Sequence, residues 1–387
     1  MRLIYVFCEP AKLESGVFKK VMQQVKAIQL TGVDAEVLLL ARKIPINFPQ
    51  KKDIRFRKTI VPPFNNRIEK LFSARDIARA ISEEIEIAGE NTVLYIRGLI
   101  PSPNLSQILR KQRRCMVFFE LQSFAEIEAK QRGSWETYLA MMVLMGNIIK
   151  NSDGIVGVTK QITEHYYKKG RKTGLAHFTN GNGIDVSSVP SRVPPSFDGE
   201  QVELLCVAQV ANWHGLDRLI WGMANSGNSN VYLHIVGDGP AIPQLKELVS
   251  HKDLEDQVIF HGFKTGEELD EMFDKCHIAV GSLGIHRKGL KETSDLKSRE
   301  YCARGIPFFN SALDADFPVS FPFRLKIPED DSPIDMEQVM YFAKNVLADT
   351  EHPIFMQEYA LSNLDWNIKM KKLKEFFEEV LKGQVGK

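Results

Sequence analysis

The sequence contains few cysteines, and their spacing argues against two kinds of stabilising site. Only five of the 387 residues are cysteine, the number is odd, and no two are separated by just two residues as in a zinc-binding pair. We therefore expect reduced core residues of a cytoplasmic protein, without zinc or disulfides. The five lie far apart and mostly inside apolar runs: Cys8, Cys115, Cys206, Cys276 and Cys302.

Long hydrophobic runs, a secretory leader and repeats are lacking too. The longest apolar stretch, residues 138–149, is too short to span a bilayer. The chain opens with a strand-like run at residues 3–7, preceded by one arginine and no small-residue cleavage pattern, so no signal peptide is expected. No segment is of low complexity or repeats at a fixed period. These absences argue against a membrane-spanning, secreted or solenoid protein.

Two cofactor signatures are also missing. The sequence GDGP at 237–240 lacks the third glycine of the dinucleotide fingerprint and comes late in the chain, which disfavours a dehydrogenase. No DxD-like pair follows a strand-like run, and Asp274 and Asp295 are isolated. We therefore expect neither a metal ion nor a bound cofactor.

Short apolar runs alternate with helical patterns along the whole chain. The runs are β-branched or aromatic and mostly unalternated, which is typical of strands buried on both faces of a parallel sheet. Helical spacing of apolar residues occurs at 17–28, 265–276 and 334–348. We predict an α/β fold with two Rossmann-like domains whose parallel sheets face each other across a cleft. The predicted strands are residues 3–7, 37–40, 93–96, 116–119, 155–158, 204–210, 231–236, 258–260, 278–280 and 307–309.

One segment has the composition of a linker between domains. Residues 187–200 contain three prolines and few apolar side chains. We place an N-terminal, acceptor-binding domain at 1–190 and a C-terminal domain at 200–365. An amphipathic helical pattern at about 366–387 can pack back on the first domain.

The net charge of +1 hides an asymmetry between the halves. Residues 1–190 hold 29 Lys and Arg against 18 Asp and Glu, whereas the remainder holds 21 against 31. Either both halves carry ordinary solvated charges, or the N-terminal half meets an anionic surface or acceptor. Its basic clusters are residues 51–58, 111–114 and 168–172. The apolar stretch 139–149, between the last two clusters, is either a buried helix or a segment that docks on an anionic membrane.

Residues 282–307 form the densest polar stretch beside apolar runs. Ser294 or Asp295 can cap a helix that begins near Leu296, and Glu292 would then precede the helix that contains Glu300. A helix N-terminus after a strand binds anions through its free N–H groups. The alternative is a solvated charged loop. The nearby cations suit a diphosphate: His286, Arg287, Lys288, Lys291 and Lys297.

The C-terminal half resembles the family 4 (group 1) retaining glycosyltransferases, which have the two-Rossmann-domain GT-B fold. Four motifs agree in order and spacing, and weaker matches in the N-terminal half are SGVFKKVMQQVKAI and HFTNGNGID. The four motifs are LLCVAQVANWHGLDRLIWGM, HIVGDGPAIPQLKELV, VIFHGFKTGEELDEMFDKCHIAV and the E-x7-E pair, Glu292 and Glu300, continued by KSREYCARGIPF.

The resemblance implies roles for individual residues. Glu300 would accept hydrogen bonds from the ribose hydroxyls, and Glu292 would bind hydroxyls of the transferred sugar. Phe263 would lie near the base, and Gly16 would let the first loop approach the phosphates. Backbone N–H groups at Ser294, Leu296 and Lys297 would contact ribose and phosphate. We assign Glu292, His214 and Lys297 to the catalytic group.

Two departures from the family pattern affect these assignments. Gln209 and His214 stand where the family has Arg and Lys, which hold the diphosphate. A protonated His214 could supply one charge; the alternative is that it only packs on its neighbour Trp213. We predict that Arg287 or Lys288 restores the other charge.

The second departure lies in the N-terminal half. Gln122 replaces a family His beside the sugar, and we place Glu120 and Gln122 on the acceptor side.

The expected activity is transfer of a sugar from a nucleotide-sugar to a glycan or polyprenyl-diphosphate-linked acceptor. The resemblance implies retention of configuration without a metal ion, in cell-surface polysaccharide synthesis. We expect a cytoplasmic protein that binds no nucleic acid, either free or peripheral on the inner face of the membrane. The alternatives are a non-catalytic nucleotide-sugar-binding protein, and an epimerase or phosphorylase of the same fold.

Overall fold

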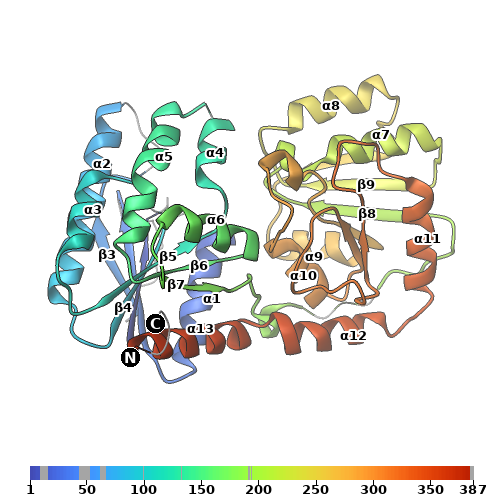
Figure 1. Ribbon diagram of the computed structural model, residues 1–387. Helices are drawn as coiled ribbons and strands as arrows, with labels where there is room; N and C mark the ends of the chain where they lie inside the picture. Colours follow the sequence, from blue (N-terminus) through green and yellow to red (C-terminus); the bar gives the residue numbers. More distant parts are fainter. Residues whose placement is uncertain are drawn as a thin grey trace. The chain divides into compact units, whose positions relative to one another are not determined.

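The chain folds into two compact units (Figure 1). The computed structural model describes residues 1–8, 16–42, 53–61, 67–98, 100–131, 133–190, 192 and 194–383. The first unit comprises Met1–Gly181 together with the C-terminal helix from Trp366, and the second comprises Asn182–Asp365. Within the described ranges, no helix combines the length and apolar character that crossing a bilayer requires.

The first unit ends at Gly181 and not at residue 190 as predicted. The Asn182 N–H donates to Ser294 Oγ at 2.7 Å, and the Val186 N–H donates to Asp365 Oδ2 at 3.2 Å. Further along, Arg192 Nη1 donates to the carbonyls of Phe273 and Cys276. Asn182, Val186 and Arg192 therefore belong to the second unit, so the proline-rich composition of residues 187–200 did not locate the boundary.

A seven-stranded parallel sheet forms the centre of the first unit, in the order β3-β2-β1-β4-β5-β6-β7. Helices α2, α3, α5 and α6 lie side by side, and α13 packs on α1 (Figure 1). The strands are β1 Arg2–Phe7, β2 Asp34–Ala41, β3 Ile54–Lys58, β4 Thr92–Arg97, β5 Met116–Leu121, β6 Gly154–Gly157 and β7 Ala176–Thr179. The helices are α1 Gly16–Gln29, α2 Arg67–Ile87, α3 Pro103–Arg110, α4 Ala125–Gln131, α5 Trp135–Lys150, α6 Lys160–Gly170 and α13 Trp366–Leu381.

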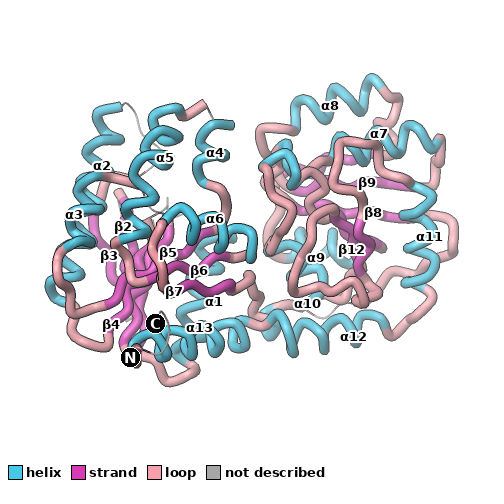
Figure 2. Tube along the Cα trace, viewed as in Figure 1, coloured by secondary structure: helices cyan, strands magenta, loops and turns pink. Residues whose placement is uncertain are grey.

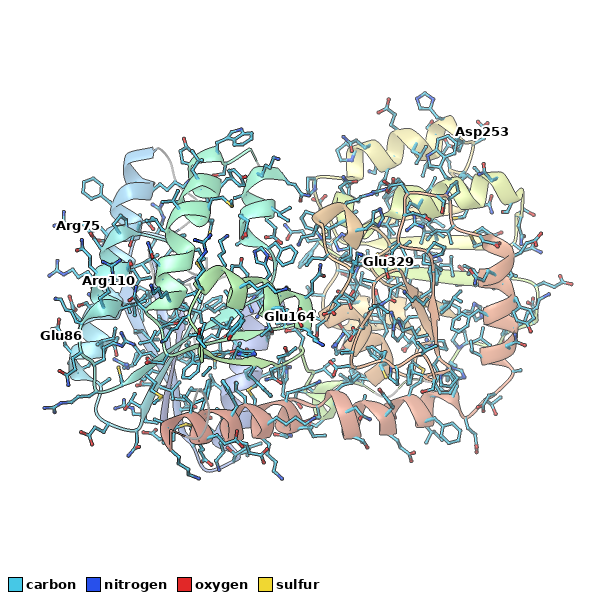
Figure 3. All side chains as sticks on the ribbon, in the orientation of Figure 1. Arg75, Glu86, Arg110, Glu164, Asp253 and Glu329 are labelled. Atoms are coloured by element: carbon cyan, nitrogen blue, oxygen red, sulfur yellow. The ribbon has the colours of Figure 1, made fainter. Side chains whose placement is uncertain are left out.

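Helix α13 is held in the first unit by aromatic contacts. The ring of Phe377 lies 4.8 Å from that of Phe118 and 5.6 Å from that of Tyr95, measured between centroids. Trp366 Nε1 donates to Gln23 Oε1 of α1 at 3.1 Å. Apolar burial of these large rings fixes the end of the chain on the sheet that begins it. The outward faces of this unit carry charged side chains such as Arg75 and Glu86 of α2 (Figure 3).

The second unit has a six-stranded parallel sheet in the order β10-β9-β8-β11-β12-β13. From β8, the strands β9 and β10 follow one another toward one edge of the sheet, and β11, β12 and β13 follow toward the other edge. The order of the strands therefore reverses between β8 and β11. The strands are β8 Val202–Val207, β9 Val231–Val236, β10 Val258–Gly262, β11 Ile278–Val280, β12 Phe308–Asn310 and β13 Arg324–Lys326. The helices are α7 Leu216–Ser226, α8 Ile242–His251, α9 Glu267–Asp274, α10 Leu296–Ala303, α11 Met336–Leu347 and α12 His352–Tyr359, with shorter turns at Val186–Ser188, Asn212–His214, Ile285–Lys288 and Ala360–Leu364.

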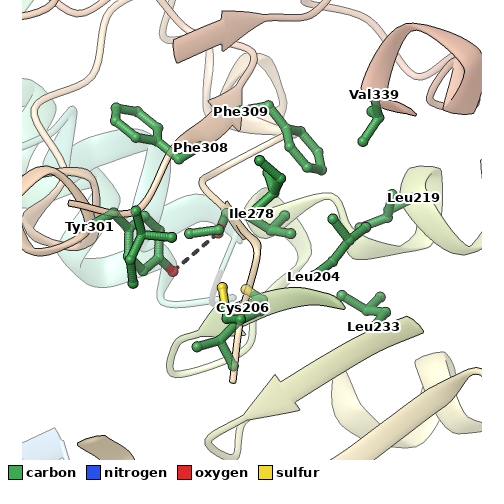
Figure 4. Close-up of a cluster of buried hydrophobic side chains, with 14 of the residues drawn as sticks. Leu204, Cys206, Leu219, Leu233, Ile278, Tyr301, Phe308, Phe309 and Val339 are labelled. Atoms are coloured by element: carbon green, nitrogen blue, oxygen red, sulfur yellow. Dashed lines mark hydrogen bonds between the residues drawn. The ribbon is translucent and has the colours of Figure 1, made fainter. Parts of the chain in front are cut away.

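Strands and helices alternate through each unit (Figure 2), so the predicted α/β fold is confirmed. In the second unit the strands bury Leu204, Ile278 and Phe308 in one apolar cluster (Figure 4). Tyr301 of α10 lies in this cluster, donates to the Val280 carbonyl at 3.2 Å, and accepts the Val207 N–H at 3.3 Å. Tyr301 thereby fixes α10 to the ends of β8 and β11. As expected, all five cysteines are buried.

Candidate functional site

The polar residues that the sequence singled out gather at the carboxyl edge of the second sheet. Strands β8 and β11 are neighbours, and the order reverses between them, which is where open α/β sheets bind ligands. The loops that follow them are joined by the Leu283 N–H, which donates to the His214 carbonyl at 3.0 Å. Gly215, with φ of 63°, makes this approach possible, because a Cβ there would lie 2.8 Å from the Gly284 nitrogen.

The loop after β9 is packed just as closely. Gly237 has φ of 116°, and a Cβ at this residue would lie 1.9 Å from the Ala208 carbonyl oxygen. The Val210 N–H donates to the Asp238 carbonyl at 2.8 Å, and the Gly237 N–H donates to the Gly262 carbonyl at 2.7 Å. The glycines of GDGP therefore allow the loops after β8, β9 and β10 to pack closely against one another.

Helix α10 begins at Leu296, as the capping pattern predicted. Asp295 is the cap, because its carboxylate accepts the Ser298 N–H at 3.2 Å and the Ser282 hydroxyl at 3.2 Å. Ser294 is buried instead, and its hydroxyl oxygen accepts the Asn182 N–H. The cap Asp295 thus joins the first turn of α10, with its free amide groups, to the loop after β11.

A buried ion pair that the sequence did not reveal holds α10 in place. The Arg299 guanidinium is fully buried and pairs with both oxygens of Asp314, and it reaches Asp316 Oδ2 at 2.5 Å. Its Nε donates to the Asn182 carbonyl at 3.0 Å. Because Asp314 is fifteen residues further along the chain, helical spacing gave no signal for this contact.

Lys297 is the cation that the structure places most directly in the site. Its ammonium nitrogen is buried and has no hydrogen-bond partner among the described residues. An ammonium without a partner in the interior is costly, and an anionic ligand would satisfy it. Its charge acts on His214, which lies in the turn after β8.

His214 is buried, in surroundings that favour its neutral ring. Burial lowers its pKa well below 6.5, and the positive charges of Lys297 and Lys288 lower it further. The Nδ1 atom accepts the Ala211 N–H at 2.9 Å, so the proton of the neutral ring is on Nε2. His214 is therefore placed to donate one hydrogen bond, without supplying a positive charge.

Arg287 and Lys288 are already engaged in contacts of their own. The Arg287 guanidinium pairs with both oxygens of Asp217 at 2.8 and 2.9 Å and donates from Nε to Asp331 at 2.7 Å. The Lys288 nitrogen lies 4.7 Å from the centroid of the Trp213 ring. Arg287 thus ties the loop after β11 to α7 in this arrangement. That Arg287 or Lys288 restores the missing charge stays a prediction.

The remaining predicted residues of this unit lie in the loops after β8, β10 and β11 and in α10. Gln209 is exposed just after β8, and the Phe263 side chain is 67% exposed just after β10. Glu292 is held by a bridge in which the Thr293 N–H donates to the Leu313 carbonyl at 2.7 Å. Glu300 accepts from the Arg304 guanidinium at 3.1 and 3.2 Å.

Glu120 lies in the interior of the first unit and not on an acceptor-facing surface. It accepts from the Tyr5 hydroxyl, from Lys20 Nζ at 3.0 Å and from Arg97 Nη1 at 3.4 Å. Burial would raise the pKa of Glu120, but Lys20 and Arg97 lower it to about 2. Its neighbour Gln122 accepts from Lys20 Nζ at 2.9 Å.

Only part of the first predicted loop can be placed. Gly16 is the first residue of α1, and residues 9–15 before it lie outside the described part of the chain. The basic residues 51 and 52 lie outside it as well.

Comparison with solved structures identifies the architecture. Sucrose-phosphate synthase of Thermosynechococcus elongatus is 17% identical and covers 99% of this chain and 100% of its own, with a TM-score of 0.71. The galactosyltransferase WaaB of the lipopolysaccharide outer core is 13% identical and covers 100% of both chains, with a TM-score of 0.64. Anabaena HepE, in complex with UDP and glucose, is 12% identical and covers 98% of this chain and 100% of its own, with a TM-score of 0.63.

The chain has the GT-B fold. Residues 191–290 match the family model for glycosyl transferases group 1. This range contains the loops after β8, β9, β10 and β11 and stops just before Glu292. No curated protein sequence matches the chain.

Proposed function

We propose that the protein is a group 1 glycosyltransferase of family 4, which transfers a sugar from a nucleotide-sugar to an acceptor hydroxyl with retention of configuration. The observation that carries the proposal is the buried, unpartnered ammonium of Lys297 in the first turn of α10, among the described residues at the reversal point of the sheet. The family match to residues 191–290 supports the same reaction. Binding of UDP and glucose by HepE favours a UDP-sugar as the substrate.

The residues have separate tasks in this reaction. Lys297, the amide end of α10 and the Nε2–H of His214 bind the diphosphate and stabilise the charge that it gains on leaving. Glu292 holds hydroxyls of the sugar, Glu300 holds the ribose, and Phe263 covers the base. Gln209 can donate a neutral hydrogen bond to the same phosphates.

The bond between the anomeric carbon and the diphosphate oxygen breaks, and the acceptor oxygen forms its bond on the same face. The acceptor proton passes to the departing diphosphate. Positioning and charge stabilisation perform this reaction without a metal ion, so EDTA should leave the rate unchanged.

The acceptor is a glycan or a polyprenyl-diphosphate-linked glycan of the cell surface, handled at the cytoplasmic side of a membrane. WaaB, which acts on the lipopolysaccharide outer core, supports this choice. The excess of basic residues in 1–190 suits an anionic, membrane-bound acceptor.

A second candidate function has one observation in its favour. Gln209 is uncharged and His214 is neutral where two cations are expected, which suits a protein that binds nucleotide-sugars without reacting them. A panel of nucleotide-sugars tested for thermal stabilisation would identify the ligand, because binding raises apparent stability by mass action. Release of nucleotide from that ligand in the presence of acceptor supports the transferase. Stabilisation with no nucleotide release, with every acceptor tested, supports the binding protein.

A further inference from the structure

Helix α5 leaves a stripe of large apolar side chains uncovered. Trp135 is 56% exposed, Leu139 57%, Met142 49% and Val143 69%. Residues spaced by three, four and seven lie on one face of a helix, so the four side chains follow one another along the outer side of α5. The opposite side of α5 packs inward through its buried residues, Met141, Met145, Ile148 and Ile149.

Exposed basic residues lie around the carboxyl end of the same helix. Helices α3, α5 and α6 lead into the adjacent parallel strands β5, β6 and β7, so their carboxyl ends share one edge of the sheet. Arg113, which follows α3, pairs with Asp153, which follows α5, at 2.8 Å. Lys172, which follows α6, donates to the Ser152 carbonyl at 3.1 Å. We call the exposed cations here the basic rim: Arg110, Lys111, Arg114, Lys150, Lys168 and Arg171.

Carboxylates near the rim are largely occupied. Asp153 is paired with Arg113, and Glu164 of α6 lies 3.8 Å from Lys160, one turn away from it along the helix (Figure 3). The surface of α3, α5 and α6 therefore combines an apolar stripe with an excess of positive charge. Contiguous apolar surface of this kind marks a binding face.

We propose that the α5 stripe and the basic rim dock the first unit on an anionic lipid bilayer. Trp, Leu, Met and Val side chains enter the interfacial region of a bilayer, while Lys and Arg remain at the headgroups and are attracted to anionic lipids. The positive charge of the basic rim favours a bilayer over a second copy of the chain as the occupant. An anionic bilayer brings negative charges to the rim, whereas pairing the α5 stripes of two copies brings none. The inference deepens the proposed function, which places the acceptor in a membrane.

Vesicle sedimentation with the full chain tests the docking surface. The protein should bind vesicles that contain phosphatidylglycerol, bind phosphatidylcholine vesicles at least tenfold more weakly, and lose binding as salt is raised. The variant Leu139→Ser/Val143→Ser should weaken binding at least tenfold. Its matched control is Ile354→Ser/Phe355→Ser, an adjacent apolar pair of the second unit exposed by 57% and 48%, which should bind as the wild type does.

A second variant and a second readout complete the test. Lys111→Gln/Arg114→Gln should reduce binding to anionic vesicles and flatten its salt dependence. Vesicles should also shift Trp135 emission to the blue, measured as the difference between wild type and Trp135→Phe.

Several outcomes would overturn the inference: no binding to anionic vesicles, unchanged binding of the Leu139→Ser/Val143→Ser protein, or a dimer in sedimentation velocity that this variant abolishes. Thermal stabilisation by the nucleotide-sugar separates this inference from the proposed function, because all these variants should keep it.

Discussion

At the scale of single residues, the charge state of two buried groups defines what each unit can do. In the second unit, burial and nearby lysines hold the pKa of His214 well below 6.5, so its neutral ring can donate one hydrogen bond. In the first unit, Glu120 is the ionised partner of Lys20 and Arg97. Both states follow from burial and from neighbours that are remote in the sequence.

The pKa of His214 should respond to Lys297. Burial is the larger cause of its low pKa and Lys297 is the next, so Lys297→Met should raise the pKa while leaving it below 6.5. An NMR titration of the imidazole carbons, with His214→Gln used to assign the resonance, measures this. A His214 pKa that does not move in Lys297→Met would show that the two groups are not neighbours.

Glu120→Gln should destabilise the first unit in a pH-dependent way. The folded-state pKa of about 2 lies below the ordinary value of 4.5, so the carboxylate stabilises the fold above about pH 4.5, and this contribution fades as the pH falls toward 2. Removing one member of a buried ion pair costs about 3 kcal/mol. Urea unfolding from pH 7 to pH 3 should show a gap between wild type and variant that narrows below pH 4.5, and a constant gap would contradict the account.

At the scale of elements, the strands and helices nearest the site follow directly from sequence pattern. All ten predicted strands correspond to strands of the structure, and the cap of α10 was predicted. The strands that the pattern missed are β3, β7 and β13, which lie at edges of the two sheets. Edge strands are partly solvated, so they lack the continuous apolar runs on which the prediction depended.

The site residues whose partners are distant could not be predicted in the same way. Arg287 was expected to bind phosphate because it stands in a basic loop, but Asp217, seventy residues earlier, pairs with it. Glu120 was expected on the acceptor side, but Tyr5 of β1 and Arg97 of β4 enclose it in the interior of the first unit. Such partners become adjacent only when the strands pair.

The loop after β9 offers a test of how closely the site elements are packed. Gly237→Ala would place a Cβ 1.9 Å from the Ala208 oxygen at a φ of 116°, so the loop must shift. We expect loss of nucleotide-sugar binding and destabilisation of about 3 kcal/mol. Gly262→Ala is the control, because φ is also positive there, at 67°, while its Cβ meets no described atom within 4 Å. Gly262→Ala should lower the free energy of unfolding by only about 1 kcal/mol, the cost of backbone strain. Equal losses for Gly237→Ala and Gly262→Ala in urea unfolding would contradict this reasoning.

At the scale of the whole molecule, the chain joins two parallel sheets of the GT-B fold, one of which carries the nucleotide-sugar site we propose. Structures at 12–17% identity establish this fold, while the activity we propose is argued from the residues at one sheet edge.

Ligand binding should therefore affect the two units differently in thermal unfolding. A nucleotide-sugar at one hundred times its Kd stabilises its unit by about 2.7 kcal/mol, or roughly 5–10 °C for a unit of this size. In hydrogen exchange, protection should rise in α10 and in the loops after β8 and β11, and remain unchanged in β1 and β4. Protection confined to the first unit would place the site elsewhere.

The most direct test of the account is the rate of sugar transfer by Lys297→Met. The wild type should transfer sugar from the stabilising nucleotide-sugar, and Lys297→Met should lower kcat/KM by about ten- to a hundredfold, as loss of a charged hydrogen bond of 1.5–3 kcal/mol requires. Lys252→Met, which removes a lysine that lies over the Trp221 ring, should keep the wild-type rate. If folded Lys297→Met transfers sugar as fast as the wild type, the site proposed at α10 is wrong.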